Sequence, residues 1–164
     1  VASTRWRFSG ADLMAFVGEV RQQGDWARGE AVFRRPDLSC LACHAIGGEG
    51  GTIGPDLNSL GTAQPIDFII GAVLEPNREV KEGFHALEFL TKDGESFQGY
   101  LLHEENQALT VRDLARNQDV TVRLADVQRR IERGSVMPAG LVDHLSRAEL
   151  RDLIRYLSDL GRRR

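Results

Sequence analysis

The sequence predicts a mainly α-helical domain interrupted by a small antiparallel β meander or barrel. Apolar residues recur at helical spacing before residue 84 and after residue 132, whereas between these positions they alternate with polar residues. Proline, glycine and serine stand at the ends of the helical stretches, where such residues begin or end helices. We therefore expect about three to five helices, with residues 84–132 as an insertion and residues 1–25 as an extra N-terminal helix.

The expected helices can be followed in chain order. Ser9 and Asp12 fit a capping box for a helix over 10–23, and a second helix is expected over 26–34, before Pro36. Pro65 suits the first turn of a third helix, which Pro76 closes. The last helix follows a Ser-x-x-Glu capping box and ends at a glycine; its apolar stripe is Leu150, Leu153, Ile154, Leu157 and Leu160.

Residues 84–132 have the pattern of short strands separated by turns. Leu87, Phe89 and Thr91 alternate before Asp93-Gly94, a dipeptide typical of a tight hairpin. Three further β-prone runs follow, at 97–102, 109–111 and 120–124. The expectation is a four-stranded antiparallel meander that can curl into a small barrel.

Composition narrows the function classes. The chain has 164 residues, 41% of them hydrophobic and 27% charged, and a net charge of −3, which is ordinary for a packed globular protein. There is no clustered basic face of the kind that nucleic-acid binders use, and no apolar run long enough to cross a membrane. Residues 1–8 lack the layout of a signal peptide, so we expect a mature chain or part of a larger protein.

Both cysteines lie in Cys40-Leu41-Ala42-Cys43-His44. Two thiols separated by two residues can add to the two vinyl groups of one haem, and the histidine that follows can bind its iron. Zinc binding would need two further ligands with suitable spacing, which His85, His103 and His144 do not offer. A thioredoxin-like redox pair, or a chance pair of buried thiols, remains as the other alternative.

The residues after this motif support a haem site. The run Gly47-Gly48-Glu49-Gly50-Gly51 allows the backbone to pass close to a flat ligand. It leads to Gly54-Pro55-Asp56-Leu57, where the carbonyl of Pro55 can accept a hydrogen bond from Nδ1 of His44 and so direct Nε2 toward iron. An apolar wall is expected from Ile53, Leu57, Leu60, Phe68 and Leu141.

The sixth iron ligand is expected to be Met137. It precedes Pro138, which keeps it out of helical geometry in a stretch that reads as a loop. Met14 lies among apolar residues at helical spacing and is interpreted as a core residue. The rival ligands are the three other histidines, and His144 is the first of them because it lies seven residues after Met137.

With these residues the chain resembles class I c-type cytochromes over residues 26–83 and 133–164, and more narrowly a bacterial haem-binding domain group, here with a β insertion before the methionine. The resemblance implies a cytochrome c fold around one haem. It also implies that the helices before the motif and at the C-terminus cross with a glycine at the contact, and Gly29 and Tyr156 are the matching positions.

The expected function is electron transfer by one covalent haem c, held by Cys40, Cys43, His44, Pro55 and Met137, with iron bound by His44 and Met137. This is an electron-transfer module, not an enzyme, serving redox donor and acceptor proteins or a fused dehydrogenase domain. The alternative is a haem-based sensor or gas-binding module in which Met137 is displaced. Haem attachment places the module in the periplasm or elsewhere outside the cytoplasm, and the β insertion is the expected surface of a homodimer.

Overall fold

The computed structural model describes residues 5–162 and divides the chain into two compact units. One contains the residues up to Glu79 together with those from Met137 onward, and the other is Val80–Val136. The predicted insertion, 84–132, lies within the second unit. The predicted domains also include residues 1–4 and 163–164, which lie outside the described residues.

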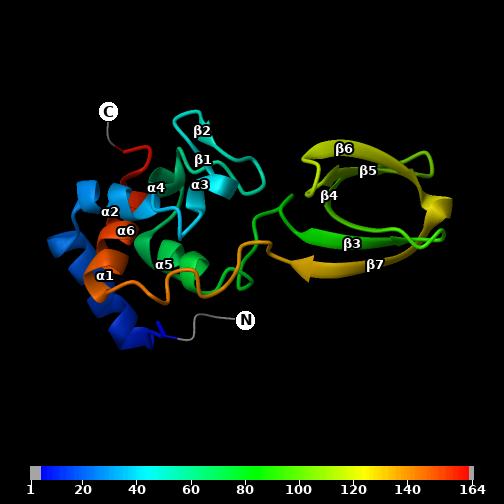
Figure 1. Ribbon diagram of the computed structural model, residues 1–164. Helices are drawn as coiled ribbons and strands as arrows, with labels where there is room; N and C mark the ends of the chain where they lie inside the picture. Colours follow the sequence, from blue (N-terminus) through cyan, green and yellow to red (C-terminus); the bar gives the residue numbers. More distant parts are fainter. Residues whose placement is uncertain (1–4, 163–164) are drawn as a thin grey trace. The chain divides into compact units, whose positions relative to one another are not determined.

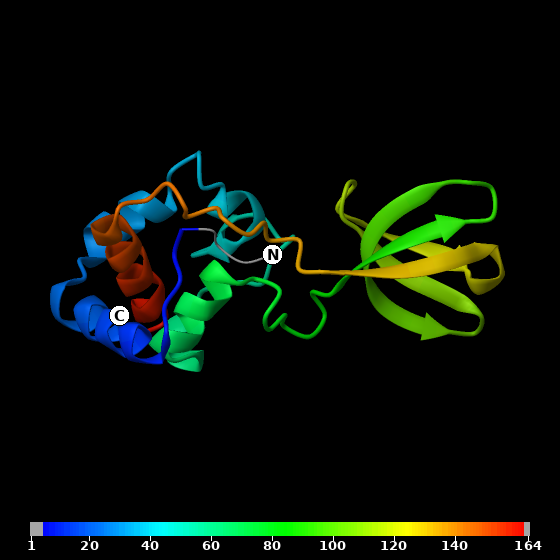
Figure 2. The same ribbon diagram turned by 90° about the horizontal axis from the view of Figure 1, so that it is seen from below.

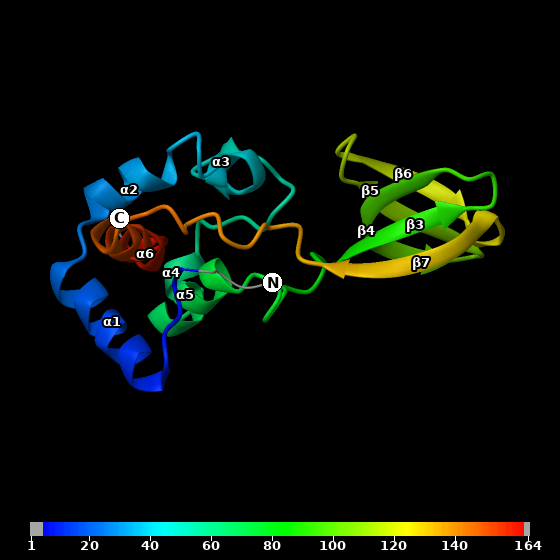
Figure 3. The same cartoon turned by 60° about the horizontal axis from the view of Figure 1, so that its bottom comes forward.

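The first unit is helical apart from one short hairpin (Figure 1). Its helices are α1 (Gly10–Gln23), α2 (Trp26–Phe33), α3 (Cys40–Cys43), α4 (Leu60–Ala63), α5 (Ile66–Leu74) and α6 (Arg147–Asp159), and its hairpin pairs β1 (Ala45–Ile46) with β2 (Glu49–Gly50). Helix α6 contacts α1, α2, α4 and α5, and Figure 3 shows it beside α2. The core of this unit is therefore built around α6.

The ends of these helices follow from local chemistry. Asp25 accepts a hydrogen bond from the Arg28 amide at the start of α2. The predicted capping box at α6 is confirmed, because the Ser146 hydroxyl accepts from the Glu149 amide and the Glu149 carboxylate accepts from the Ser146 amide. The box predicted at Ser9 is wrong: its hydroxyl donates to the Asp12 carboxylate and caps no backbone amide.

The core of the helical unit agrees with the predicted stripe on the last helix, all five members of which are buried. Gly29 on α2 lies against α6 so closely that a Cβ would meet the Asp152 carbonyl at 1.9 Å and the Tyr156 Cβ at 2.7 Å. The contact expected at Gly29 and Tyr156 is confirmed. The interpretation of Met14 as a core residue is wrong: it is 63% exposed, because α1 buries Phe16, Val17 and Val20 on another face.

The second unit is one antiparallel sheet with the strand order β6-β5-β4-β3-β7, which curves strongly (Figure 2). Its strands are β3 (Ala86–Thr91), β4 (Ser96–Glu105), β5 (Ala108–Asp113), β6 (Gln118–Arg123) and β7 (Val127–Gly134), with the short 3-10 helix η1 (Leu124–Asp126) before the last. Phe89, Leu109 and Val111 form its buried centre.

Two expectations about fold class need correction. The sheet has five strands instead of four, because β7 crosses over to pair with β3, with Ala86 opposite Gly134. About 35% of the residues are helical and 25% lie in strands, so the prediction of a mainly α protein is wrong. The chain is a mixed α/β protein, since the sheet is a full compact unit with its own buried centre.

Candidate functional site

The Cys-x-x-Cys-His turn is built on the short helix α3. Ser39 precedes it in the left-handed conformation, with φ of 54°, and its hydroxyl donates to the Pro36 carbonyl at 3.0 Å. The His44 amide donates to the Cys40 carbonyl at 2.9 Å and closes the turn. The two cysteines and His44 are thus presented by a single helical turn, as the spacing predicts.

Both cysteines are free thiols and both are half-buried. Burial raises the pKa of the Cys40 thiol to about 11, and the nearby Cys43 and Asp37 add to this effect. Reactive redox cysteines need a depressed pKa, because the thiolate is the nucleophile. The environment of Cys40 therefore does not favour a thioredoxin-like role.

The imidazole of His44 is held from two sides. Nδ1 lies 2.7 Å from the carbonyl oxygen of Pro55, so Nδ1–H donates to it and Nε2 is left as the ligating atom. A Cβ on Gly54 would meet Cε1 of the ring at 2.6 Å and Nδ1 at 2.8 Å. Glycine at this position is therefore what lets the backbone lie against the ring.

The glycine-rich loop packs on the backbone of the same turn. The amide of Gly51 donates to the Leu41 carbonyl and that of Gly54 to the Cys43 carbonyl, both at 2.8 Å. A Cβ on Gly51 would meet the Ala42 carbonyl at 2.0 Å. The sequence predicts that the run from Gly47 to Gly51 passes close to a flat ligand. The structure shows that Gly51 and Gly54 lie against the turn itself.

The predicted apolar wall consists of half-buried side chains: Ile53, Leu57, Leu60, Phe68 and Leu141. All five belong to the helical unit, and Leu57 and Leu60 pack against its core. They present apolar surface that is only partly covered by protein. The residues present fit a haem, since they combine two free thiols, an oriented imidazole and apolar side chains in one unit.

Met137 is the first residue of the helical unit after the β unit. It is half-buried in a bend between β7 and α6, outside any helix or strand. The rival ligand His144 is engaged elsewhere, because its Nε2 lies 2.7 Å from the Asp37 carboxylate. His85 and His103 belong to the β unit and are exposed.

Two other kinds of site were candidates among the described residues: a cluster of metal-binding side chains and a groove in the β unit. Neither fits a ligand better than the Cys-x-x-Cys-His turn does. Among residues 5–162, no group of three or more His, Cys, Asp or Glu side chains is arranged to hold a metal ion by itself. The groove has a volume of about 520 Å³, and its charged side chains are of both signs. Arg116 pairs there with Asp113 and Arg123 with Asp126, so the groove offers no field of one sign for a ligand.

The fold and the site together define a mixed α/β chain whose helical unit presents a Cys-x-x-Cys-His turn with an oriented imidazole. Comparison with models of known protein families gave no match, and comparison with curated proteins gave no relative. The resemblance to class I c-type cytochromes is wrong as a family assignment, because the described residues form a mixed α/β protein with a five-stranded antiparallel sheet. The basis for a functional proposal is therefore the local chemistry of the Cys-x-x-Cys-His turn.

Proposed function

We propose that this chain binds one haem covalently through Cys40 and Cys43, with His44 as an axial ligand of the iron, and that it transfers electrons. The observation that carries the proposal is the hydrogen bond from His44 to the Pro55 carbonyl. This bond fixes one tautomer of the imidazole and directs its free nitrogen away from the protein backbone. Histidines that bind a metal usually donate their other ring N–H to an acceptor of this kind.

Each residue has a separate task in this proposal. Cys40 and Cys43 would hold the porphyrin through thioether bonds, His44 would donate the lone pair of Nε2 to the iron, and Pro55 would keep the imidazole ring in place. The five apolar wall residues reduce contact with water. When bound, the haem supplies a one-electron ferric–ferrous couple. Met137 is the residue that would supply the second protein ligand to the iron, and its half-buried position in the bend before Pro138 supports this.

The covalent attachment can be tested by expressing the chain with a bacterial haem-attachment system and measuring its molecular mass by mass spectrometry under denaturing conditions. The wild type should gain the mass of one haem. The variants Cys40→Ala and Cys43→Ala should each keep a single thioether, and the double variant should lose the haem on denaturation. A wild-type chain that gains no mass would disprove the proposal.

The methionine ligand can be tested with a matched pair, since the chain has two methionines. The Met137→Leu variant should lose the sulfur-to-iron absorption band of the oxidised protein. Met14→Leu should keep it, because Met14 lies exposed on α1. Equal spectra for the two variants would exclude Met137 as the ligand.

The wider role follows from the same chemistry. The module exchanges electrons with donor and acceptor proteins or with a fused dehydrogenase domain, and it acts outside the cytoplasm, where haem is attached to such thiols. No helix among the described residues is long and apolar enough to cross a membrane. A gas sensor is the alternative, and ready binding of carbon monoxide by the reduced wild-type protein would favour it.

The β unit is the proposed site of a homodimer. Strands β6 and β7 lie at the two edges of its sheet, where unpaired backbone groups can accept a further strand. Sedimentation at increasing protein concentration measures this association directly.

A further inference from the structure

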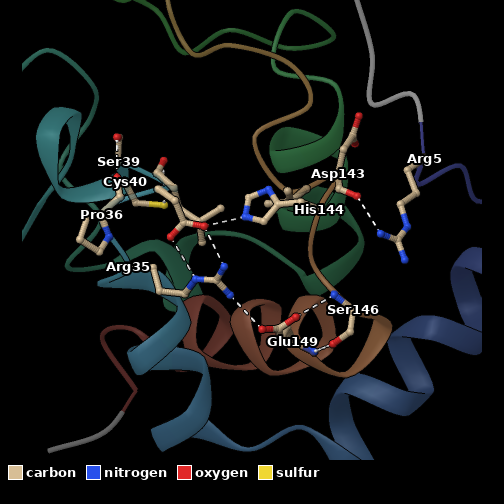
Figure 4. A network of polar contacts seen from close by, with 12 residues as sticks. Arg5, Arg35, Pro36, Ser39, Cys40, Asp143, His144, Ser146 and Glu149 are labelled. Atoms are coloured by element: carbon tan, nitrogen blue, oxygen red, sulfur yellow. Dashed lines mark hydrogen bonds and ion pairs between the residues drawn. The ribbon is translucent and has the colours of Figure 1, made fainter.

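A polar network joins the segment before Cys40 to the segment after Met137 (Figure 4). Its members are Arg35, Asp37, His144 and Glu149, and we refer to it as the Asp37 network. The carboxylate of Asp37 accepts hydrogen bonds from Nε2 of His144 at 2.7 Å and from Arg35 at 2.7 and 3.1 Å. Asp37 and His144 are 107 positions apart in the sequence, so this contact fixes two distant segments against each other.

The network is anchored in the fold at both ends. Arg35 also donates to Glu149 at 2.8 Å, and Glu149 belongs to the capping box of α6. On the other side, the neighbours of Asp37 and His144, Leu38 and Leu145, are both fully buried. The backbone on both sides of the contact is therefore anchored in the core, whereas the side chains of Asp37 and His144 are about half exposed. The Asp37 carboxylate accepts charge-assisted hydrogen bonds from Arg35, which are stronger than neutral ones.

The network also reaches the attachment turn. Asp37 lies three residues before Cys40 and helps to raise the pKa of its thiol. Ser39 between them is held in the left-handed conformation by its bond to Pro36. Cys40 Sγ lies 3.9 Å from the carbonyl of Leu38, the residue that follows Asp37, and Figure 4 draws Cys40 in the same view as His144. On the far side, seven positions separate His144 from Met137.

We propose that Asp37 is a positioning residue that fixes the segment carrying Met137 relative to the haem-attachment turn. This inference rests on the proposed function. A segment tethered near both of its ends samples fewer conformations than one tethered at a single end. Through His144, Asp37 supplies the tether on the side of α6, which would hold Met137 where it could bind the iron of a haem attached at Cys40 and Cys43.

The test uses the haem-loaded full chain and four substitutions, one of which, His144→Gln, removes the hydrogen-bond partner of Asp37. Asp37→Asn removes the charge while keeping the shape, Asp37→Glu restores the charge, and Glu104→Gln removes an exposed ion pair with Arg130 in the β unit as the matched control. Two readouts are combined. One is hydrogen exchange at the amides of Asp143 and Leu145, which bond to the Gly140 and Val142 carbonyls. The other is carbon monoxide binding by the reduced protein.

Asp37→Asn should speed exchange at these two amides by about two- to fivefold, the range expected for one exposed ion pair. It should also raise the fraction of reduced protein that binds carbon monoxide and weaken the sulfur-to-iron band. Asp37→Glu should return both readouts most of the way to their wild-type values, because it restores the charge. Glu104→Gln should leave both readouts unchanged. His144→Gln should reproduce Asp37→Asn, and the double variant should add nothing further.

Three results would overturn the inference or the function beneath it, and they can be told apart. Unchanged exchange in Asp37→Asn would show that the network does not tether the segment. Faster exchange with unchanged carbon monoxide binding and an unchanged band would show that the tether does not position Met137. A wild-type chain without covalent haem would remove the proposed function, and the exchange data would still report on the contact between Asp37 and His144.

Discussion

The imidazole of His44 and the backbone of Gly54 approach so closely that no side chain fits between them. We expect Gly54→Ala to destabilise the protein by about 1–3 kcal/mol, the usual result of overpacking, because the new methyl group must displace the ring. Pro55→Ala keeps the carbonyl that accepts the His44 proton and should cost less than about 1 kcal/mol. Urea unfolding of the two variants measures both losses, and equal losses would argue against a tight contact at Gly54.

A second prediction concerns Asp152, which is 3% exposed on α6. Burial alone would raise the pKa of Asp152. The carboxylate accepts hydrogen bonds from Arg28, at 2.7 Å, from the Asp25 amide and from Arg151, and together these bonds outweigh the effect of burial. The pKa of Asp152 therefore lies below its ordinary value. A depressed folded-state pKa contributes stability above the unfolded value of about 3.9, and this is lost as the pH falls through the folded value.

The expected result is that wild-type stability declines as the pH is lowered from about 5 toward 2. Asp152→Asn should lose about 2 kcal/mol at pH 7, the scale of hydrogen bonds to a charged group, and should show a flatter decline. Glu79→Gln, at an exposed position in the same unit, serves as the control and should change stability by less than about 0.5 kcal/mol. Urea unfolding at several pH values gives these numbers, and parallel curves for wild type and Asp152→Asn would refute the assignment.

At the scale of elements, the contact between α2 and α6 depends on a glycine. A methyl group at Gly29 would overlap the Asp152 carbonyl, which cannot move without breaking α6. We expect Gly29→Ala to cost at least about 3 kcal/mol. Gly18 lies on α1, where an added Cβ would meet nothing within 4 Å, so Gly18→Ala should stabilise by up to about 1 kcal/mol through helix propensity. Thermal unfolding compares the two; a tolerated Gly29→Ala would mean that the helices can separate freely.

Elements with strong local signals could be predicted from the sequence. Helix α1 begins and ends at the predicted residues, and α6 shows both its capping box and its apolar stripe. Strand β7 was missed because its eight residues contain only Val127 and Ile131 as apolar side chains and do not alternate. Its pairing with β3 depends on residues about 40 positions away, which no local pattern records.

The candidate site also has features that could be predicted from the sequence and features that could not. The motif and the carbonyl of Pro55 lie within a short stretch, so their hydrogen bond could be predicted from spacing. The exposure of Met14 could not, because its neighbours are apolar and only the packing of α1 decides which face is buried. The Asp37 network left no sequence signal, since it joins charged residues of an ordinary kind across more than 100 positions.

At the scale of the whole molecule, the two units have separate cores. The buried residues of the helical unit and those of the β unit form two clusters without a common member. The β unit also begins and ends at neighbouring positions, because Ala86 pairs with Gly134. An insertion whose two ends meet can be removed without stretching the chain that receives it.

We therefore expect a chain in which residues 80–136 are replaced by a short glycine-serine linker to fold. Its circular dichroism should keep the helical signal and lose the strand contribution, and it should unfold cooperatively because the helical core is intact. It should still gain the mass of one haem, since Cys40, Cys43, His44 and Met137 all lie outside the deleted residues. Leu153→Ala in the shortened chain is the control for cooperativity and should cost about 2–5 kcal/mol. A shortened chain that is helical but melts without a cooperative transition would show that the helical unit needs the sheet to pack, and the β unit would then be a structural part of the helical unit instead of an insertion.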